Sequence, residues 1–307
     1  MLRNRDGSKL PNSPRISVIM PNFNKSSYIG EAIESVLTQT YQDFELIIID
    51  DCSTDSSIQV IDTFRRRDSR IHLIRHLRNL GVSKARNDGL AYSSGRFVSF
   101  LDSDDVYAST RLDAQMRILS EREKPVVVYT DWFEIDSSGY IVVPFHDDAE
   151  RSEGMWFPYF LVGTTPTASI MFPRTCLDKV GLFDESLHSS EDVDFSLRLA
   201  KSFPFAYIPL PLYGYRVYSG NFVRRDSRAM NFRWKTIVLE KHVLGDLSSL
   251  DSRTRKLAYD KLFARYLSSG QYTKLLRVGI TKRYGLWSLL EMPLRSRFFR
   301  KRVQLTI

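Results

Sequence analysis

The sequence has few cysteines and no long apolar segment. Cys52 and Cys176 are the only two cysteines among 307 residues, which excludes a disulfide framework and is typical of a reducing compartment. No run of about 18 apolar residues occurs, so we expect no transmembrane helix. Residues 1–14 form a polar tail without the apolar core of a signal peptide. We therefore expect a cytoplasmic protein that is not exported.

Acidic residues are scarce in the last part of the chain. Residues 221–307 hold 20 Lys/Arg and 6 Asp/Glu, a balance of +14, and because the whole chain carries +8, the rest carries −6. This contrast predicts a carboxylate-using catalytic region followed by a basic helical region, residues 222–307. Within that region, residues 282–302 combine seven Lys/Arg with interleaved aromatic side chains. Such a segment suits the inner face of an anionic membrane, although it can also pack on the catalytic region; nucleic acid is the least favoured partner.

The first half of the chain alternates short apolar runs with helical patterns. The apolar runs predict strands at residues 15–20, 44–49, 71–75 and 96–101. Near-continuous apolar strands are typical of a sheet that is covered on both faces. We therefore predict a doubly wound α/β fold with a mixed, mainly parallel sheet. Ligands of such folds bind beyond the carboxyl ends of the strands, where three polar loops follow, at residues 21–27, 50–55 and 102–105.

Three acidic residues stand together at the end of the fourth predicted strand. Asp102, Asp104 and Asp105 lie within four positions, and their charges repel unless something neutralises them. Carboxylates suit Mg²⁺ or Mn²⁺, which can carry a diphosphate leaving group. The alternative is a solvated acidic turn that caps the next helix.

Two acidic pairs occur elsewhere at element ends. Asp50 and Asp51 follow the second predicted strand, where a carboxylate can accept hydrogen bonds from a ribose or a base; a helix cap is the alternative. Glu191 and Asp192 stand in the first turn of a predicted helix, where the helix dipole keeps a carboxylate ionised and available as a base. An acidic first turn without a catalytic role is again the alternative.

The order of these clusters resembles the family 2 glycosyltransferases, which have the GT-A fold. The resemblance covers residues 15–221, with a nucleotide-binding part at 15–105 and an acceptor side at 106–221. It rests on six motifs: PNFNK (21–25), IIIDDCSTD (47–55), NLGVSKARNDGL (79–90), GRFVSFLDSDD (95–105), GLFDESLHSSEDVDFSLRL (181–199) and YGYRVYSGN (213–221).

The resemblance implies a role for each matching residue. The nucleotide-sugar site would be formed by Pro21, Asn24, Asp50, Asp51, Arg86, Asn87, Asp102 and Ser103. Asp51 would accept from the base, usually uracil in this family, and Asp50 would support that loop. Asp104, in the family's DXD motif, would contact the metal, with Asp102 as a second candidate. Asp192 would be the catalytic base, with Glu191 and Arg216 in support.

Helical spacing also favours Asp192 over its neighbour as the base. Phe195 and Leu199, three and seven residues beyond Asp192, are apolar, which predicts that Asp192 faces inward. The positions that follow Glu191 at helical spacing include Arg198. We therefore expect Glu191 on a more exposed side, where it pairs with Arg198 or orients a loop.

Two positions depart from the family pattern. Cys52 replaces a common glycine in the DDGSTD motif, which makes positive φ harder to adopt there. Tyr218 stands where many relatives have a histidine near the metal or diphosphate, so a third contact from this position is in doubt.

The sequence thus predicts a metal-dependent, inverting glycosyltransferase. It would move a sugar from a nucleotide-diphosphate donor, most simply a UDP-sugar, to a hydroxyl of a saccharide or lipid-linked acceptor in polysaccharide or glycolipid assembly. A nucleotidyltransferase is one alternative, but the sequence has no Gly-rich phosphate loop with a lysine. A nucleotide-sugar-binding module without activity is another, which the presence of Asp104 and Asp192 disfavours.

Overall fold

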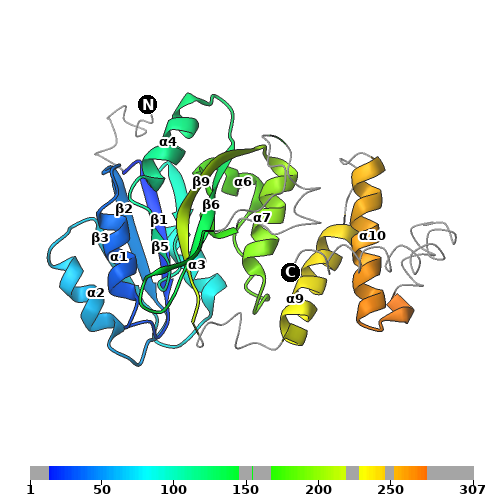
Figure 1. Ribbon diagram of the computed structural model, residues 1–307, viewed down its shortest axis with the longest axis horizontal. Coiled ribbons are helices and arrows are strands. Elements are labelled where there is room, and N and C mark those ends of the chain that lie inside the picture. Colours follow the sequence, from blue (N-terminus) through cyan, green and yellow to red (C-terminus); the bar gives the residue numbers. More distant parts are fainter. Residues whose placement is uncertain (1–13, 145–153, 155–166, 219–227, 246–251, 275–307) are drawn as a thin grey trace. The chain divides into compact units, whose positions relative to one another are not determined.

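The computed structural model describes residues 14–144, 154, 167–218, 228–245 and 252–274 (Figure 1). The chain divides into two compact units. The first comprises residues 1–160 and 164–234, and the second comprises 161–163 and 235–307. The boundary at 221/222 that the charge contrast predicted lies outside the described residues and stays a prediction.

A nine-stranded sheet forms the centre of the first unit. Its strands are β1 Ile16–Asn22, β2 Phe44–Asp50, β3 Ile71–Arg75, β4 Phe97–Phe100, β5 Val106–Tyr107, β6 Val127–Ile135, β7 Ile141–Pro144, β8 Met171–Pro173 and β9 Phe205–Arg216. Strands β3, β2, β1 and β4 lie side by side in parallel. Next to β4 the sheet continues in the order β8, β6, β9, β5 with mixed directions, and β7 pairs with β6. The predicted mixed α/β fold is confirmed, with its parallel strands concentrated in the first half.

Helices alternate with the strands of the parallel half. The helices of the first unit are α1 Ile29–Leu37, α2 Ser57–Arg65, α3 Val82–Tyr92, α4 Arg111–Glu121, α6 Leu177–Val180 and α7 Glu191–Ser202, with short 3₁₀ turns η1 Thr167–Ser169 and η2 Arg174–Cys176. The four-residue spacing of apolar residues explains α1, which buries Ile29, Ala32, Ile33 and Val36 along one side.

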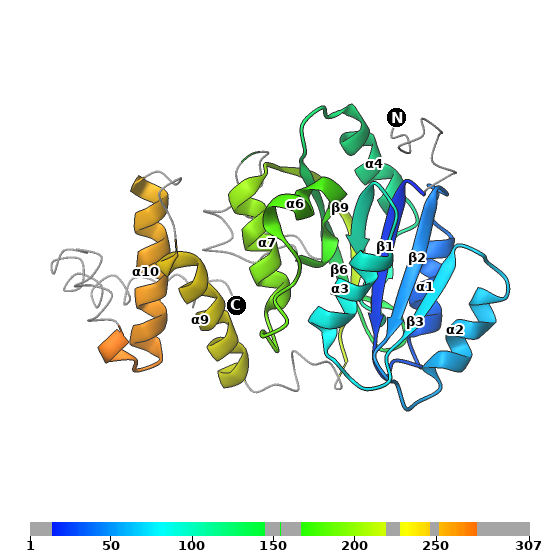
Figure 2. The same ribbon diagram turned by 180° about the vertical axis from the view of Figure 1, so that it is seen from behind.

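The sheet is covered on both faces, as the apolar strands predicted. Every residue of β1 is buried. Ile16, Val18 and Met20 point to one face and join a core cluster with side chains of α1 and α4. Ile19 points to the other face, beneath α3, where a Cβ added to Gly89 would lie 2.5 Å from the Ile19 side chain. Figures 1 and 2 show these helical layers from opposite sides.

The second unit contains most of α9 Arg228–Leu244 and all of α10 Ser252–Ser268. Its buried apolar residues include Val238, Leu239, Val243, Ala258, Leu262, Phe263 and Tyr266. In the part of the chain that the structure describes, no helix has both the length and the apolar character that crossing a membrane requires. The predicted membrane-binding segment 282–302 lies outside the described residues.

Candidate active site

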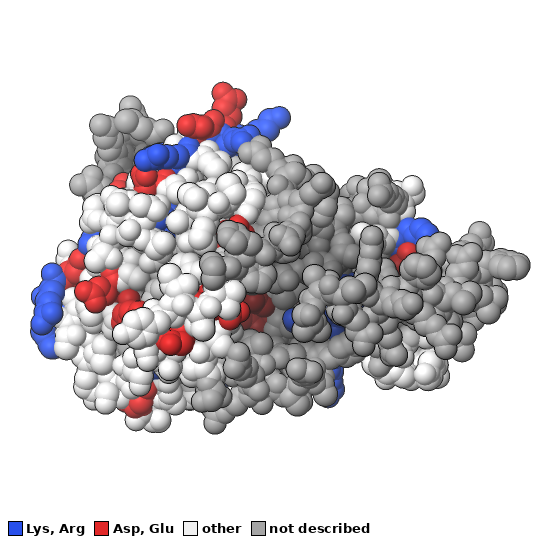
Figure 3. Space-filling model, in the orientation of Figure 1, with Lys and Arg blue, Asp and Glu red and all other residues white. Residues whose placement is uncertain are grey.

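The loops that follow β1, β2 and β4 lie at one edge of the sheet. The parallel register sets Asn22 opposite Asp50, so the loops after β1 and β2 begin side by side. Phe100, the last residue of β4, lies opposite Ile19 of β1, which brings residues 102–105 to the same edge. Figure 3 shows acidic side chains across the middle of the visible face of the first unit. The three loops predicted to share one crevice are therefore neighbours.

Asp50 joins the first two loops. Its Oδ1 accepts a hydrogen bond from Asn22 Nδ2 at 2.7 Å, and its Oδ2 accepts one from the Ser53 backbone N–H at 3.0 Å. Asn24, in the left-handed region at φ 53°, accepts the Thr54 N–H at 2.8 Å. Pro21 is buried within β1. These contacts fix the shape of the loops, while contact of Pro21 and Asn24 with a nucleotide stays a prediction.

Asp51 holds the loop that leads into α3. Its carboxylate accepts the backbone N–H groups of Leu80 at 2.7 Å and Gly81 at 2.8 Å. His76 Nδ1 lies 2.7 Å from the same carboxylate, and His76 Nε2 lies 3.0 Å from Asp88. Because a carboxylate accepts about four hydrogen bonds, these contacts leave room for about one more, and the base contact that the family resemblance implies stays a prediction. No motif in the sequence singles out His76.

Cys52 adopts positive φ despite its side chain. Its φ is 65°, a conformation that disfavours a residue with a Cβ by about 1–2 kcal/mol. We therefore expect Cys52→Gly to raise the free energy of unfolding by about 0.5–1 kcal/mol, since part of the gain is lost to the greater freedom of glycine in the unfolded chain. Chemical denaturation measures this change. Cys176→Ala, at a buried position with φ −62°, is the control and should lower stability; a loss in Cys52→Gly would contradict the strain.

Each carboxylate of the DXD region already has its own partner. Arg86 Nη2 lies 2.8 Å from Asp102 Oδ1, and Lys25 Nζ lies 2.6 Å from Asp104 Oδ2. Asp105 is 2% exposed and is held by hydrogen bonds. Cations of the chain itself thus neutralise two of the clustered charges, and contact of Asp104 or Asp102 with a metal stays a prediction.

Asp105 and Arg216 fix this loop to β9. The Tyr213 hydroxyl donates to Asp105 Oδ2 at 2.6 Å, and the Arg216 backbone N–H donates to Oδ1 at 2.8 Å. Burial, with Asp104 and Asp102 close by, raises the pKa of Asp105 well above its usual range. The Arg216 guanidinium, 1% exposed, donates to the Asp104 carbonyl at 2.7 Å. Asp105 and Arg216 thus hold the loop at residues 102–105 against β9.

Arg86 links two of the predicted motifs. Its guanidinium is buried and lies 2.6 Å from Glu191 Oε1 as well as 2.8 Å from Asp102 Oδ1. Burial alone would lower the pKa of Arg86, but the two carboxylates outweigh it and raise the pKa. The result is a fixed positive charge between the DXD loop and the start of α7. Arg86 and Glu191 are 105 positions apart in the sequence, and contact of Arg86 with a donor stays a prediction.

Two other predicted donor-site residues have contacts within the protein. Asn87 Nδ2 donates to the Phe183 carbonyl at 3.0 Å, and Asn87 Oδ1 accepts the Phe183 N–H at 2.9 Å. Ser103 is 3% exposed within the turn that follows β4. Asn87 therefore attaches the loop before α7 to α3, and a direct donor contact from either residue stays a prediction.

The structure reverses the expected surroundings of Glu191. The carboxylate was predicted to be exposed and near Arg198, but Glu191 is 7% exposed and pairs with Arg86, while Arg198 pairs with Asp194 at 2.9 Å. The helical-spacing argument failed because α3 covers the first turn of α7 from a second side. Burial and the adjacent Asp192 raise the pKa of Glu191, which Arg86 offsets only in part. Glu191 is thus engaged in an ion pair.

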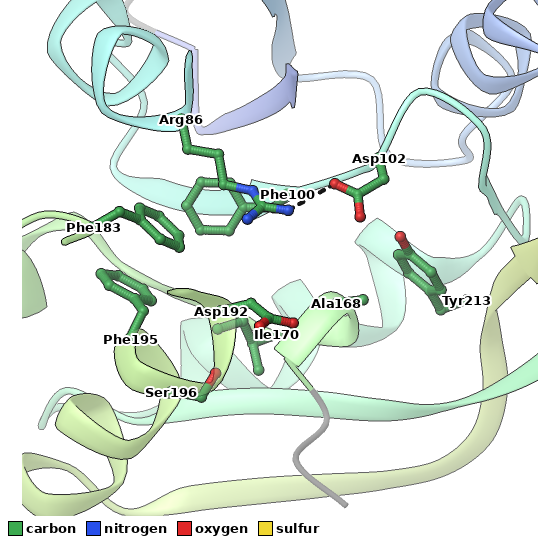
Figure 4. A pocket seen from close by; sticks show the side chains of 10 residues that line it. All are labelled: Arg86, Phe100, Asp102, Ala168, Ile170, Phe183, Asp192, Phe195, Ser196 and Tyr213. Atoms are coloured by element: carbon green, nitrogen blue, oxygen red, sulfur yellow. Dashed lines mark hydrogen bonds and ion pairs between the residues drawn. The ribbon is translucent and has the colours of Figure 1, made fainter. Parts of the chain in front are cut away.

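Asp192 lines a pocket at this edge of the sheet (Figure 4). The pocket is open to solvent. Arg86 and Asp102 lie on one wall and Asp192 on the opposite wall, and the other lining residues include Phe100, Phe183, Phe195 and Tyr213. Asp192 is partly exposed and is the second residue of α7, whose N-cap Ser190 has a φ of 64°. Such a strained residue is often found at functional sites.

Ser196 is a pocket residue that sequence reasoning missed. It lies four residues beyond Asp192 on α7 and lines the same pocket. The residue is 1% exposed, and its hydroxyl has no hydrogen-bond partner among the described residues. A buried hydroxyl without a partner is costly, and a bound hydroxyl group can satisfy it. The available signal was its spacing of one helical turn from the candidate base.

The DXD carboxylates can accept a diphosphate-bound metal but cannot form a complete metal site. In the described part of the chain, no group of three or more His, Cys, Asp or Glu side chains is arranged to hold a metal. Mg²⁺ and Mn²⁺ often use only one or two protein carboxylates and take further oxygens from phosphates. Asp104 Oδ1 and Asp102 Oδ2 have no donor among the described residues. The donor set therefore fits a metal that arrives with a diphosphate.

The fold places the first unit in the GT-A class. TarS of S. aureus in complex with UDP-GlcNAc has this fold with a TM-score of 0.66 at 20% identity, over 83% of this chain and 73% of that chain. The mannosyltransferase PcManGT of Pyrobaculum calidifontis, in complex with GDP-Man and Mn²⁺, matches with a TM-score of 0.58 at 15% identity, over 95% and 87% of the chains. The model of glycosyl transferase family 2 matches residues 17–167, and through that region the chain belongs to this family.

Curated relatives agree with this assignment. TuaG of Bacillus subtilis, a glycosyltransferase named for teichuronic acid biosynthesis, is 40% identical over 109 residues, which are 36% of this chain and 43% of TuaG. The glycosyltransferase GlyG of Streptococcus pneumoniae is 26% identical over 285 residues, covering 86% of this chain and 91% of GlyG. The chain thus spans less than half of some relatives and nearly all of others.

Proposed function

We propose that this protein is a metal-dependent, inverting glycosyltransferase that uses a nucleotide-diphosphate sugar, with UDP as the favoured nucleotide. The observation that carries the proposal is the pocket that sets Asp192 across from the Arg86–Asp102 pair. This pocket lies at the carboxyl ends of the parallel strands, where open α/β sheets bind ligands. TarS, which was solved with UDP-GlcNAc, and PcManGT, which was solved with GDP-Man and Mn²⁺, support a nucleotide-sugar donor and a divalent metal.

Asp192 is proposed to act as the general base. Its carboxylate takes the proton of an acceptor hydroxyl while that oxygen attacks the anomeric carbon, and the bond from this carbon to the diphosphate oxygen breaks. A single displacement from the opposite side inverts the configuration. Arg86 contributes by holding Asp102 and the start of α7 in one geometry, because much of the rate comes from alignment of the two substrates.

Asp104 is proposed to hold the divalent metal together with the donor diphosphate, with Asp102 beside it. When bound, Mg²⁺ or Mn²⁺ supplies positive charge that stabilises the departing nucleoside diphosphate. The protein presents Asp104 on a loop that Arg216 and Asp105 fix to β9.

The acceptor is proposed to be a saccharide or lipid-linked saccharide in polysaccharide or glycolipid assembly. The name of TuaG supports a cell-surface polysaccharide. We also propose that the protein works in the cytoplasm, at the inner face of the membrane.

A panel of nucleotide sugars tests the donor assignment. A donor that binds the folded state raises the melting temperature by mass action, so UDP-sugars with Mn²⁺ should raise it more than the same sugars with EDTA. A panel without any shift would contradict the proposal.

Ser196→Ala should weaken binding of the acceptor and leave the affinity for the nucleotide unchanged. One lost hydrogen bond is worth about 1 kcal/mol, which corresponds to a rise of roughly fivefold in the acceptor KM. Steady-state kinetics with an acceptor from a saccharide and lipid-linked panel measure the change, and calorimetry with UDP provides the comparison. Ser120→Ala, on the exposed side of α4, is the control. An unchanged acceptor KM in Ser196→Ala would remove Ser196 from the acceptor site.

A further inference from the structure

Lys25 neutralises Asp104, the carboxylate proposed to hold the metal. Its Nζ lies 2.6 Å from Asp104 Oδ2, and the side chains are only 23% and 14% exposed. The Tyr218 hydroxyl donates to the same Oδ2 at 2.8 Å, and Lys25 also donates to that hydroxyl. A protein ammonium therefore binds the same carboxylate that is proposed to bind a divalent cation.

The main chain of Lys25 is fixed, while its side chain can move. The Lys25 carbonyl accepts the N–H groups of Tyr28 and Ile29 at 2.9 Å each, and the Lys25 N–H donates to Ser57 Oγ at 3.2 Å. The ammonium stands at the end of a flexible four-carbon stem. Lys25 can therefore leave Asp104 by side-chain rotation without any change in the loop.

The counterion of Asp104 is easier to displace than the partners of Asp102 and Asp105. Arg86, the partner of Asp102, is also held by Glu191 and is buried. Asp105 is enclosed and accepts from a backbone N–H. Among the described residues, Lys25 forms an ion pair with Asp104 alone. Asp104 is thus the DXD carboxylate whose counterion can be displaced.

We propose that Lys25 is an internal counterion of Asp104 that a divalent cation must displace, so that the protein binds metal weakly until a nucleotide diphosphate is present. The inference rests on the proposed function of Asp104. A metal on either oxygen of Asp104 would stand close to the Lys25 ammonium on Oδ2, and like charges repel strongly in a partly buried site. The negative charge of the diphosphate attracts both the metal ion and the Lys25 ammonium. Bound nucleotide therefore strengthens metal binding, and bound metal strengthens nucleotide binding to the same extent. Lys25 is in this sense a positioning residue, because it sets the order in which the site fills.

Lys25→Met tests the competition directly. Calorimetry should show Mn²⁺ binding to the nucleotide-free variant at least about tenfold more tightly than to the unmodified protein, and a smaller gain in Mn²⁺ affinity when UDP is added. Lys256→Met is the matched control, since Lys256 pairs with Asp260 at 3.1 Å in the second unit; its Mn²⁺ affinity should not change. Equal Mn²⁺ affinity in Lys25→Met and the unmodified protein would overturn the inference, as would weaker Mn²⁺ binding in the variant.

A second measurement needs no variant. Acetylation of lysines, followed by mass spectrometry, should show Lys25 reacting slowly without metal and severalfold faster at saturating Mg²⁺, because the released amine loses its carboxylate partner. Lys256 should react at the same rate in both conditions. If Mg²⁺ leaves the acetylation rate of Lys25 unchanged, the metal does not displace Lys25 from Asp104, and the inference is wrong.

Asp104→Asn separates this inference from the proposed function. If Asp104→Asn loses Mn²⁺ binding in the presence of UDP while Lys25→Met behaves as the unmodified protein, Asp104 binds the metal but Lys25 does not compete with it. If Asp104→Asn binds Mn²⁺ and UDP normally, Asp104 does not bind the metal, and the proposed role of Lys25 is wrong as well.

Discussion

Asp192→Asn is expected to lower the rate of sugar transfer by at least about a hundredfold, the lower end of general-base contributions. The amide cannot accept the acceptor's proton, and the neighbouring carboxylate of Glu191 cannot replace it because Arg86 holds it at 2.6 Å. The affinity for UDP should stay within about twofold, since the base faces the acceptor. Transfer kinetics beside calorimetry with UDP measure both quantities.

Two companion variants make the assignment of the base falsifiable. Asp62→Asn, at an exposed ion pair of α2, is the control and should keep full activity. Normal transfer in Asp192→Asn together with no transfer in Glu191→Gln would reverse the assignment. Loss of both transfer and UDP binding in Asp192→Asn would show that Asp192 is structural.

Asp104→Asn is expected to remove most of the metal-dependent activity, by about a hundredfold or more at saturating Mn²⁺. A neutral amide binds a divalent cation poorly, so the charge that stabilises the leaving diphosphate is lost. The fold should survive, because Asp105 and Arg216 fix the loop without the Asp104 side chain. Turnover as a function of Mn²⁺ concentration and the melting temperature measure the two effects.

The control for the metal site is Asp113→Asn, which removes an exposed carboxylate that pairs with Arg117 on α4. It should leave the dependence on Mn²⁺ unchanged. Turnover of Asp104→Asn at low Mn²⁺ that equals the rate of the unmodified protein would show that this carboxylate does not hold the metal.

The parallel half of the fold could be predicted because its signals are local. The apolar runs before the motif loops became β1 to β4, and the spacing within each helix set its buried face. Strand β9 could not be predicted in the same way. Pro209 and Pro211 interrupt its sequence, which reads as a loop, but both are exposed where the pairing with β6 shifts register. A proline at such an irregularity removes no required hydrogen bond.

The residues of the candidate site could be predicted from the sequence, but the contacts between them could not. The motifs identified Arg86, Asp104 and Asp192 as candidates, but the partners of these residues lie far away in the sequence. Lys25 and Asp104 are 79 residues apart, so no spacing rule connects them. The expectation of an exposed Glu191 failed for the same reason, since one helix viewed alone does not show that α3 covers it.

Release of UDP from UDP-sugars, measured with and without divalent metal, separates a glycosyltransferase from a binding module. We expect at least one UDP-sugar to be turned over with Mn²⁺ or Mg²⁺, EDTA to stop the reaction, and Asp104→Asn to remove it. Acceptor addition should accelerate the release in the unmodified protein and not in Asp192→Asn. Absence of turnover for every UDP-sugar and every metal, in a protein that still binds UDP, would instead identify a nucleotide-sugar-binding module without catalytic activity.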